Sequence, residues 1–97
     1  MGKLYRNQNI LETDVEDLWD FQGGICPICN QNIFKEGTGM ERPCVDHDHA
    51  TGAIRGIIHS RCNIMLGYAQ DSIETLETAI RYLKNTPASI FFSREEI

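Results

Sequence analysis

The stretch CVDHDHATGAIRGIIHSRCN, residues 44–63, holds the densest group of chemically active side chains in the chain. Its apolar and polar residues predict two short strands, over residues 43–48 and 53–58, joined by a tight turn. A helix is expected to follow over about residues 60–66 and to be ended by Gly67. The local order of strand, strand and helix predicts an α+β fold.

An N-terminal helix is predicted over residues 13–22. Thr13 and Glu16 have the spacing of a capping box, in which Thr13 is the N-cap and Glu16 reaches back to it. Gly23 and Gly24 then stop the helical pattern. The residues before this helix carry no strong pattern.

A C-terminal helix is predicted over residues 72–84, after a second capping signal at residues 71–74. Pro87 is expected to end this region, which leaves residues 86–97 as a tail. The helix carries one apolar stripe, formed by Ile73, Leu76, Ile80 and Leu83. This stripe and Phe91-Phe92 of the tail can belong to the core or form a homodimer face.

The length of 97 residues predicts a single domain, residues 1–97, around a core at residues 26–67. A chain of this size buries a marginal apolar core and usually needs disulfides or a metal as a staple. The N-terminus lacks the pattern of a secretory signal, and no apolar run approaches a membrane span. We therefore expect a cytoplasmic, reducing location, where cysteines bind metals more often than they form disulfides.

Two chelating pairs predict a structural zinc site. Cys26 and Cys29 form one pair, and His59 and Cys62 form the other, with 29 residues between the pairs. Zinc takes four thiolate or imidazole ligands in a tetrahedron, and a closed set of four leaves no position for a substrate. Zinc binding and folding are then expected to be coupled.

Two alternatives remain open for these side chains. All four can be buried without any metal ion. Cys44 can also be the fourth ligand in place of His59, although it has no paired partner. We favour His59, and Cys44 is then expected to be a small buried apolar residue.

The run Asp46-His47-Asp48-His49 predicts a phosphodiesterase site. A neutral imidazole can take a proton from water near pH 7, and a divalent cation can neutralise the phosphate and the leaving oxygen. Asp46 and Asn63 offer the oxygen ligands that magnesium or manganese prefers. Successive side chains of a straight strand face opposite ways, so Asp46 and His47 can share one phosphate only where the strand ends or bulges.

Other interpretations of this run compete with catalysis. The alternation of aspartate and histidine can form a solvated strand face. His47 and His49 can bind a second zinc ion, and His49 can be a turn residue without a chemical role. The adjacent hairpin and the sequence His59-x-x-Cys62-Asn63 favour the catalytic interpretation.

The formal charge of −5 does not favour binding to nucleic acid, because phosphate contact favours basic surfaces. The acidic residues crowd the predicted N-terminal helix, whereas the segment from Cys26 to Asn63 has balanced charges. Bound cations would make that segment positive. Arg55 and Arg61 are our candidates for contacts to DNA phosphates, although Arg55 can also be an exposed strand residue.

Several stretches resemble the recombination endonuclease VII family of phages, within the His-Me finger (ββα-metal, HNH-like) nucleases. They are GKLY at 2–5, CPIC at 26–29, VDHDHATG at 45–52, IRGII at 54–58 and CNIMLG at 62–67. The resemblance implies a small zinc-stapled ββα-metal module with flanking helices. It also implies a phage or prophage protein that acts in a host cell.

The resemblance implies roles for individual residues. Asp46 and Asn63 would bind the catalytic metal, His47 would be the general base, and His49 would assist at the phosphate or the metal. Cys26, Cys29 and Cys62 match zinc ligands. The family usually has cysteine where this chain has His59, which is also an acceptable zinc ligand.

The sequence therefore predicts a DNA endonuclease that hydrolyses phosphodiester bonds with one magnesium or manganese ion beside a structural zinc. Nicking, duplex cleavage and branched-DNA cleavage all remain open. The first alternative is a non-catalytic zinc module that binds nucleic acid or protein. A second alternative is a structural or inhibitory partner protein, a function that the acidic composition would suit.

Overall fold

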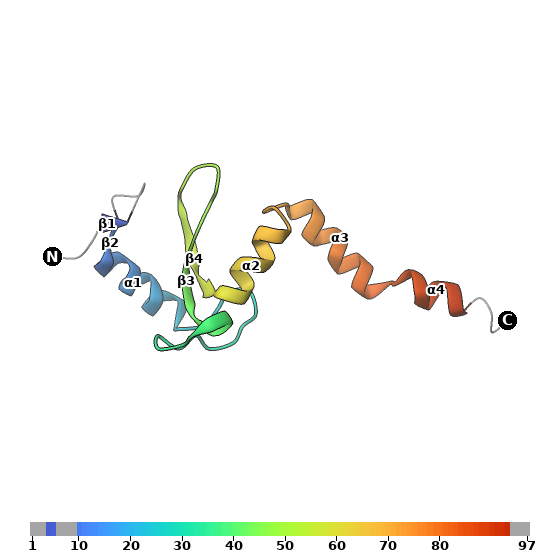
Figure 1. Ribbon diagram of the computed structural model, residues 1–97, viewed down its shortest axis with the longest axis horizontal. Coiled ribbons are helices and arrows are strands. Elements are labelled where there is room, and N and C mark those ends of the chain that lie inside the picture. The colour runs from blue at the N-terminus through green and yellow to red at the C-terminus, as the bar shows by residue number, and fades with distance from the viewer. Residues whose placement is uncertain (1–3, 6–9, 94–97) are drawn as a thin grey trace. The chain divides into compact units, whose positions relative to one another are not determined.

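The computed structural model describes residues 4–5 and 10–93, and Figure 1 shows the order of their helices and strands. Helices and short antiparallel strands are both present, so the predicted α+β class is confirmed. The chain divides into two compact units, Met1–Met65 and Leu66–Ile97. The expectation of a single domain stays a prediction.

The first unit opens with a two-stranded antiparallel sheet that the sequence pattern did not predict. Strand β1, Leu4–Tyr5, pairs with β2, Ile10–Leu11. Strands of two residues are too short to show a hydrophobic period, which explains why this pairing was missed.

Helix α1, Glu12–Gln22, confirms the predicted N-terminal helix. The helix begins at Glu12, one residue before the predicted start at residue 13. The helix ends as expected, since Gly23 and Gly24 adopt φ values of 67° and 66°, which glycine tolerates without steric cost.

The centre of the first unit is the hairpin of β3, Pro43–His47, and β4, Ile54–His59. A short 3₁₀ helix η1, Gly39–Glu41, precedes it. Both predicted strands are confirmed to within one residue. The Asp48 carboxylate closes the turn, because it accepts hydrogen bonds from the backbone N–H groups of Ala50 and Thr51 at 2.8 and 3.1 Å. These bonds lower the pKa of Asp48.

One face of the hairpin is turned towards α1. Val15 and Trp19 of the helix line the same hollow as Pro43, Val45 and Ile57 of the strands. Because side chains alternate along a strand, the residues between them, including Asp46, belong to the opposite face. Asp46 therefore points away from the face that packs towards α1.

The Gln22 side chain joins the end of α1 to β4. Its Oε1 accepts a hydrogen bond from the Ile57 N–H at 2.8 Å, and its Nε2 donates one to the Ile57 carbonyl at 2.8 Å. The carboxamide therefore satisfies the backbone groups that Ile57 presents away from β3, as a neighbouring strand would. The same Nε2 also donates to the Ile25 carbonyl at 3.2 Å.

Helix α2, Ser60–Tyr68, follows β4 directly, as the strand, strand, helix prediction requires. The prediction that Gly67 ends this helix is wrong, because Gly67 lies inside it. The chain turns after Tyr68 instead, where Gln70 and Asp71 both have φ of 56°. Two consecutive left-handed residues stop a helix irrespective of where glycine stands.

In the second unit, helix α3, Ile73–Lys84, confirms the predicted C-terminal helix. Its N-cap is Ser72, whose hydroxyl accepts a hydrogen bond from the Thr75 N–H at 3.0 Å. Residues 87–93 of the predicted tail form helix α4, Pro87–Ser93, which the sequence did not predict. Proline is well suited to the first position of a helix, since its missing N–H would have no partner there.

The apolar stripe of α3 is largely exposed in the second unit. Ile73 is 73% exposed and Leu83 is 75% exposed. In α4, the rings of Phe91 and Phe92 meet edge to face at 5.1 Å. A homodimer stays a prediction. Among the residues that the structure describes, no helix is both long and apolar enough to cross a membrane.

We predict that Gln22→Ala lowers the free energy of unfolding by about 1–3 kcal/mol, because it leaves the Ile57 N–H and carbonyl without their partner. Urea denaturation of the metal-loaded protein measures the change. Gln31→Ala is the matched control, since Gln31 is exposed and contributes its backbone carbonyl rather than its side chain. Equal stability of the two variants would contradict the role of Gln22.

Candidate functional site

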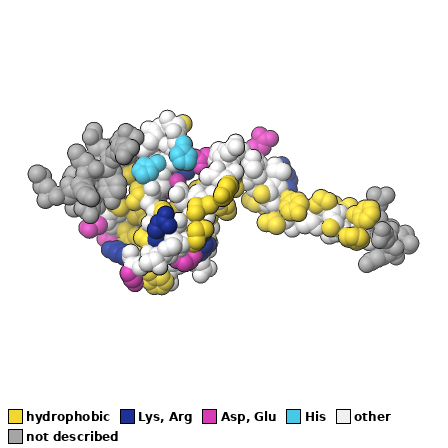
Figure 2. Space-filling view, in the orientation of Figure 1, with side chains coloured by type: hydrophobic (Ala, Val, Ile, Leu, Met, Phe, Trp, Pro, Cys, Tyr) yellow, Lys and Arg dark blue, Asp and Glu magenta, His cyan; other side chains and the backbone are white. Residues whose placement is uncertain are grey.

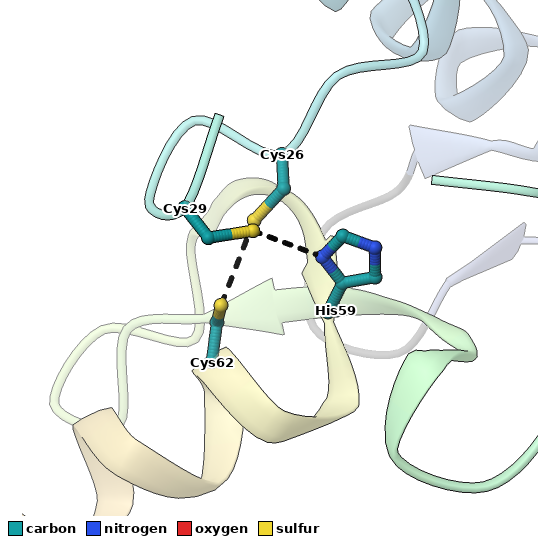
Figure 3. Close-up of side chains that lie close together, drawn as sticks. All are labelled: Cys26, Cys29, His59 and Cys62. Atoms are coloured by element: carbon teal, nitrogen blue, oxygen red, sulfur yellow. Dashed lines mark hydrogen bonds between the residues drawn. The ribbon is translucent and has the colours of Figure 1, made fainter. Parts of the chain in front are cut away.

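The structure brings together the side chains of Cys26, Cys29, His59 and Cys62 (Figure 3). Their ligand atoms all lie within 4.8 Å of one another. The Cys26 and Cys62 sulfur atoms are 3.8 Å apart, and Cys29 Sγ lies 3.3 Å from His59 Nδ1. A tetrahedral zinc site with Zn–S bonds of about 2.3 Å has sulfur–sulfur edges of about 3.8 Å. The donor set therefore fits zinc.

A tight backbone turn presents the first two ligands. The Cys26 carbonyl accepts a hydrogen bond from the Asn30 N–H, and the Cys26 N–H donates to the Gln31 carbonyl, both at 2.9 Å. Asn30 adopts φ of 61° to close this turn, a conformation that asparagine tolerates better than most residues. His59 ends β4 and Cys62 lies in the first turn of α2, so the cluster joins this loop to the strand–helix junction.

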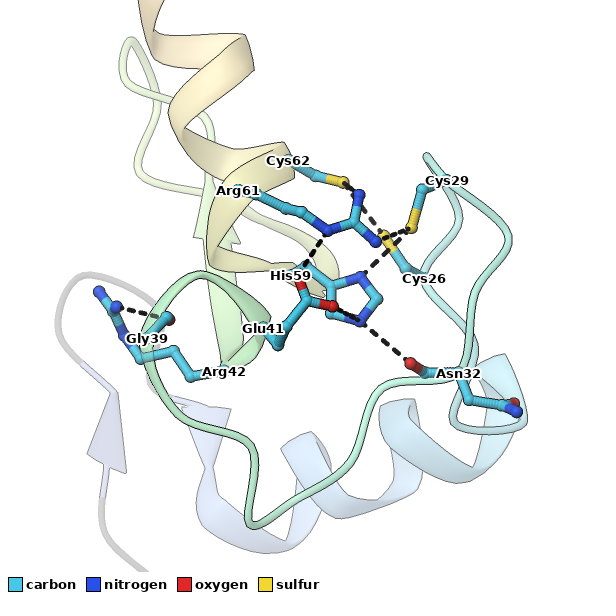
Figure 4. Close-up of polar contacts among 9 residues, drawn as sticks. All are labelled: Cys26, Cys29, Asn32, Gly39, Glu41, Arg42, His59, Arg61 and Cys62. Atoms are coloured by element: carbon cyan, nitrogen blue, oxygen red, sulfur yellow. Dashed lines mark hydrogen bonds and ion pairs between the residues drawn. The ribbon is translucent and has the colours of Figure 1, made fainter.

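The His59 ring is held by a contact on each of its nitrogen atoms (Figure 4). Nδ1 faces the Cys29 sulfur, and Nε2 lies 3.0 Å from the Asn32 carbonyl oxygen. A carbonyl can only accept, so Nε2 carries the proton and donates it. Nδ1 is then the nitrogen available to a metal ion, with its tautomer set by the Asn32 carbonyl.

The thiols differ in how readily they ionise. Burial raises the pKa of Cys62 to about 12. Burial also opposes ionisation of Cys26, but hydrogen bonds from backbone N–H groups and His59 outweigh it and lower its pKa to about 6. A cation bound by the cluster would favour the thiolate form of every cysteine in it.

Cys44 does not join the cluster. It pairs with Ile58 within the hairpin and is half-buried. Between the two alternatives for the fourth ligand, the structure groups His59 with the three cysteines.

The Asp46-His47 pair lies at an irregularity of the hairpin. Asp46 is opposite Gly56 and His47 is opposite Ile54, so Arg55 is an extra residue in β4 between these two pairs. This is a β-bulge in β4, which interrupts the alternation of faces in that strand at Arg55. The sequence-based requirement that the strand ends or bulges at the Asp46-His47 pair is met by the end of the strand, since β3 ends at His47.

Asp46 is a buried carboxylate, 5% exposed, held by Arg55. Arg55 Nε donates to Asp46 Oδ2 at 2.7 Å, and Arg55 Nη2 donates to Asp46 Oδ1 at 3.0 Å. Two parallel bonds of this kind fix both the position and the plane of a carboxylate. Arg55, the bulge residue, and Asp46 therefore form a bidentate ion pair across the hairpin.

The other predicted catalytic residues occupy nearby elements of the chain. His47 is half-buried at the end of β3, and His49 is exposed in the turn. Asn63 is half-buried in α2, directly after Cys62. Their catalytic roles stay predictions.

Arg61 contacts the cysteine cluster and η1. Its Nε donates to Glu41 Oε2 at 2.8 Å, and its Nη2 donates to Cys29 Sγ at 3.2 Å. Arg55 and Arg61 as phosphate contacts stay predictions, and both guanidinium groups are engaged within the chain. Sequence reasoning did not identify Asn32 or Glu41 as neighbours of the cluster, because a loop carbonyl and a surface glutamate carry no motif.

A closed set of four metal-type ligands, tied to an antiparallel hairpin and the helix that follows it, defines a small metal-stapled α+β module. A family model described as recombination endonuclease VII matches residues 2–85. The chain belongs to the recombination endonuclease VII family, as the sequence motifs predicted.

Two curated relatives come from phages. The "Gene 59 protein" of Mycobacterium phage D29 is 46% identical over 72 residues, which are 73% of this chain and 41% of that protein. The "Gene 59 protein" of Mycobacterium phage L5 is likewise 46% identical over 72 residues and is covered to 42%. The chain thus spans about two fifths of these relatives' length. No solved structure matches it significantly.

We predict that His59→Ala and Cys62→Ser lose bound zinc and, with it, the cooperative thermal unfolding of the protein, because three ligands leave the tetrahedron open. Zinc content by mass spectrometry and thermal circular dichroism measure both effects. Cys44→Ser is the matched control and should retain zinc. Loss of zinc from the Cys44 variant, with zinc retained in the His59 variant, would make Cys44 the fourth ligand.

Proposed function

We propose that this chain is a metal-dependent DNA endonuclease that hydrolyses phosphodiester bonds. Membership of the recombination endonuclease VII family supports the reaction class. The observation that carries the assignment is the break in the hairpin register between Asp46 and His47. The extra residue, Arg55, lies in β4 opposite the point where β3 ends, so Asp46, its partner Arg55 and His47 occupy neighbouring positions at the turn end of the hairpin.

Asp46 and Asn63 are the residues that would hold a catalytic magnesium or manganese ion. Both offer oxygen donors, and Asp46 is held in one orientation by Arg55. When bound, the ion would supply charge neutralisation at the phosphate and at the leaving oxygen. Asn63 adjoins Cys62, so the zinc cluster would fix the turn of α2 from which its amide projects.

His47 is the general base in this proposal. A neutral imidazole can accept the proton of the attacking water at neutral pH. Its half-buried position at the end of β3 leaves part of the ring accessible to water while the strand limits its motion. The exposed His49 would assist at the phosphate.

Arg55 would contact the phosphate on the DNA strand. Its guanidinium is already placed against Asp46, on the bulge of β4. Figure 2 shows histidine side chains at the surface of the first unit, on the face drawn there. His59 is only 1% exposed, which leaves His47 and His49 as the histidines available to a DNA substrate.

The decisive experiment uses supercoiled plasmid and the zinc-loaded protein, with and without magnesium or manganese. Wild type should convert the plasmid to nicked or linear DNA only with the added metal. His47→Ala should reduce the rate by about 10²–10⁴-fold, the usual contribution of a general base. Asp46→Asn should also reduce it strongly, whereas Asp20→Asn in α1 is the matched control and should cleave normally.

The outcomes separate the two leading functions. Equal inactivity of wild type and both site variants on plasmid and branched DNA, with zinc retained, would contradict the endonuclease proposal. A non-catalytic zinc module that binds nucleic acid or protein would then take its place. A high proportion of linear product early in the reaction would favour two coordinated cuts, hence a dimer.

A further inference from the structure

The Arg61 guanidinium spans two cysteine sulfur atoms and one carboxylate (Figure 4). Nη2 lies 3.2 Å from Cys29 Sγ, Nη1 lies 3.7 Å from Cys62 Sγ, and Nε donates to Glu41 Oε2 at 2.8 Å. Neither Arg61 nor Glu41 belongs to the four-ligand set. Arg61 nevertheless contacts two of its sulfur atoms directly.

The charge of the cluster explains why a cation is useful there. Three thiolates and one neutral imidazole around a zinc dication carry a net charge of −1. Cys26 and Cys62 are buried, whereas Cys29 is half-buried and is the thiolate most open to solvent. Arg61 donates its shorter sulfur contact to Cys29, so its positive charge lies beside the most accessible negative one.

The geometry also explains why the cation is arginine. A guanidinium presents five N–H groups in a rigid plane, which lets it reach several acceptors at once. A lysine ammonium is a single point charge on a flexible stem and cannot reproduce this fork. Through Glu41, the same fork ties η1 to the beginning of α2.

We propose that Arg61 is a positioning residue of the zinc cluster, which retains the metal by neutralising and orienting the Cys29 and Cys62 thiolates. Glu41 holds the guanidinium in place through its bond to Nε. This role assigns Arg61 to the metal rather than to DNA. It rests on the zinc site and requires neither the catalytic ion nor DNA cleavage.

Zinc release from the loaded protein to an excess of a colorimetric chelator, 4-(2-pyridylazo)resorcinol, tests this assignment. Removing a group that orients metal ligands usually lowers metal affinity about tenfold to hundredfold, so Arg61→Ala should release zinc faster than wild type by about the same factor. Arg61→Lys should release it at an intermediate rate, because it keeps the charge without the fork. Glu41→Gln should have a smaller effect in the same direction.

Two arginine variants are matched controls. Arg42→Ala removes a neighbouring arginine that contacts the Gly39 carbonyl, and Arg81→Ala removes the same charge from α3. Both should release zinc at the wild-type rate. Circular dichroism of each loaded variant checks that its helix content is unchanged.

Release at the wild-type rate from Arg61→Ala and Arg61→Lys would overturn the assignment, as would equal acceleration by Arg81→Ala. If Arg61→Ala cannot be loaded with zinc, Arg61→Lys and Glu41→Gln decide the matter. Unchanged rates in those two variants would also overturn it. A wild-type protein that binds no zinc would overturn the zinc site itself, whatever its nuclease activity.

Discussion

The clustering of Cys26, Cys29, His59 and Cys62 is the constraint on which the first unit depends. Within the described part of the chain, buried apolar side chains other than the ligands are few: Ile33, Ile57 and Ile58. Such a core is too small to hold a loop, a hairpin and a helix in register by apolar burial alone. The ligand cluster joins all three, since its members come from the loop after α1, the end of β4 and the first turn of α2.

Hydrogen bonds from side chains to backbone groups extend this order to α1 and to the loop that holds Asn32. Gln22 attaches α1 to the edge of β4, and the Asn32 carbonyl orients the His59 ring. Helix α1 therefore supports the hairpin along the outer edge of β4, and the ligand cluster supports it at the end of β4 where His59 lies.

The acidic overall charge conceals a specific local arrangement of arginines. Arg55 neutralises the buried Asp46, and Arg61 lies between Glu41 and the cysteine sulfur atoms. Each guanidinium thus compensates negative charge that the chain itself concentrates. The formal net charge of −5 therefore says little about the local charge around these groups.

The sequence alone determined the features that depend on local chemistry. Ligand spacing predicted the cluster, alternation predicted β3 and β4, and the family motifs predicted membership of the recombination endonuclease VII family. The prediction that Gly67 ends α2 was wrong, because the helix continues to Tyr68 and two left-handed residues follow shortly after it. The sequence also did not predict the helix α4, which begins at Pro87. Only the tertiary structure decided which distant groups meet: Gln22 with Ile57, Arg55 with Asp46, and Arg61 with Glu41 and Cys29. These contacts depend on where folding brings separate segments, and hydrogen-bond partners of that kind leave no periodic trace in the chain.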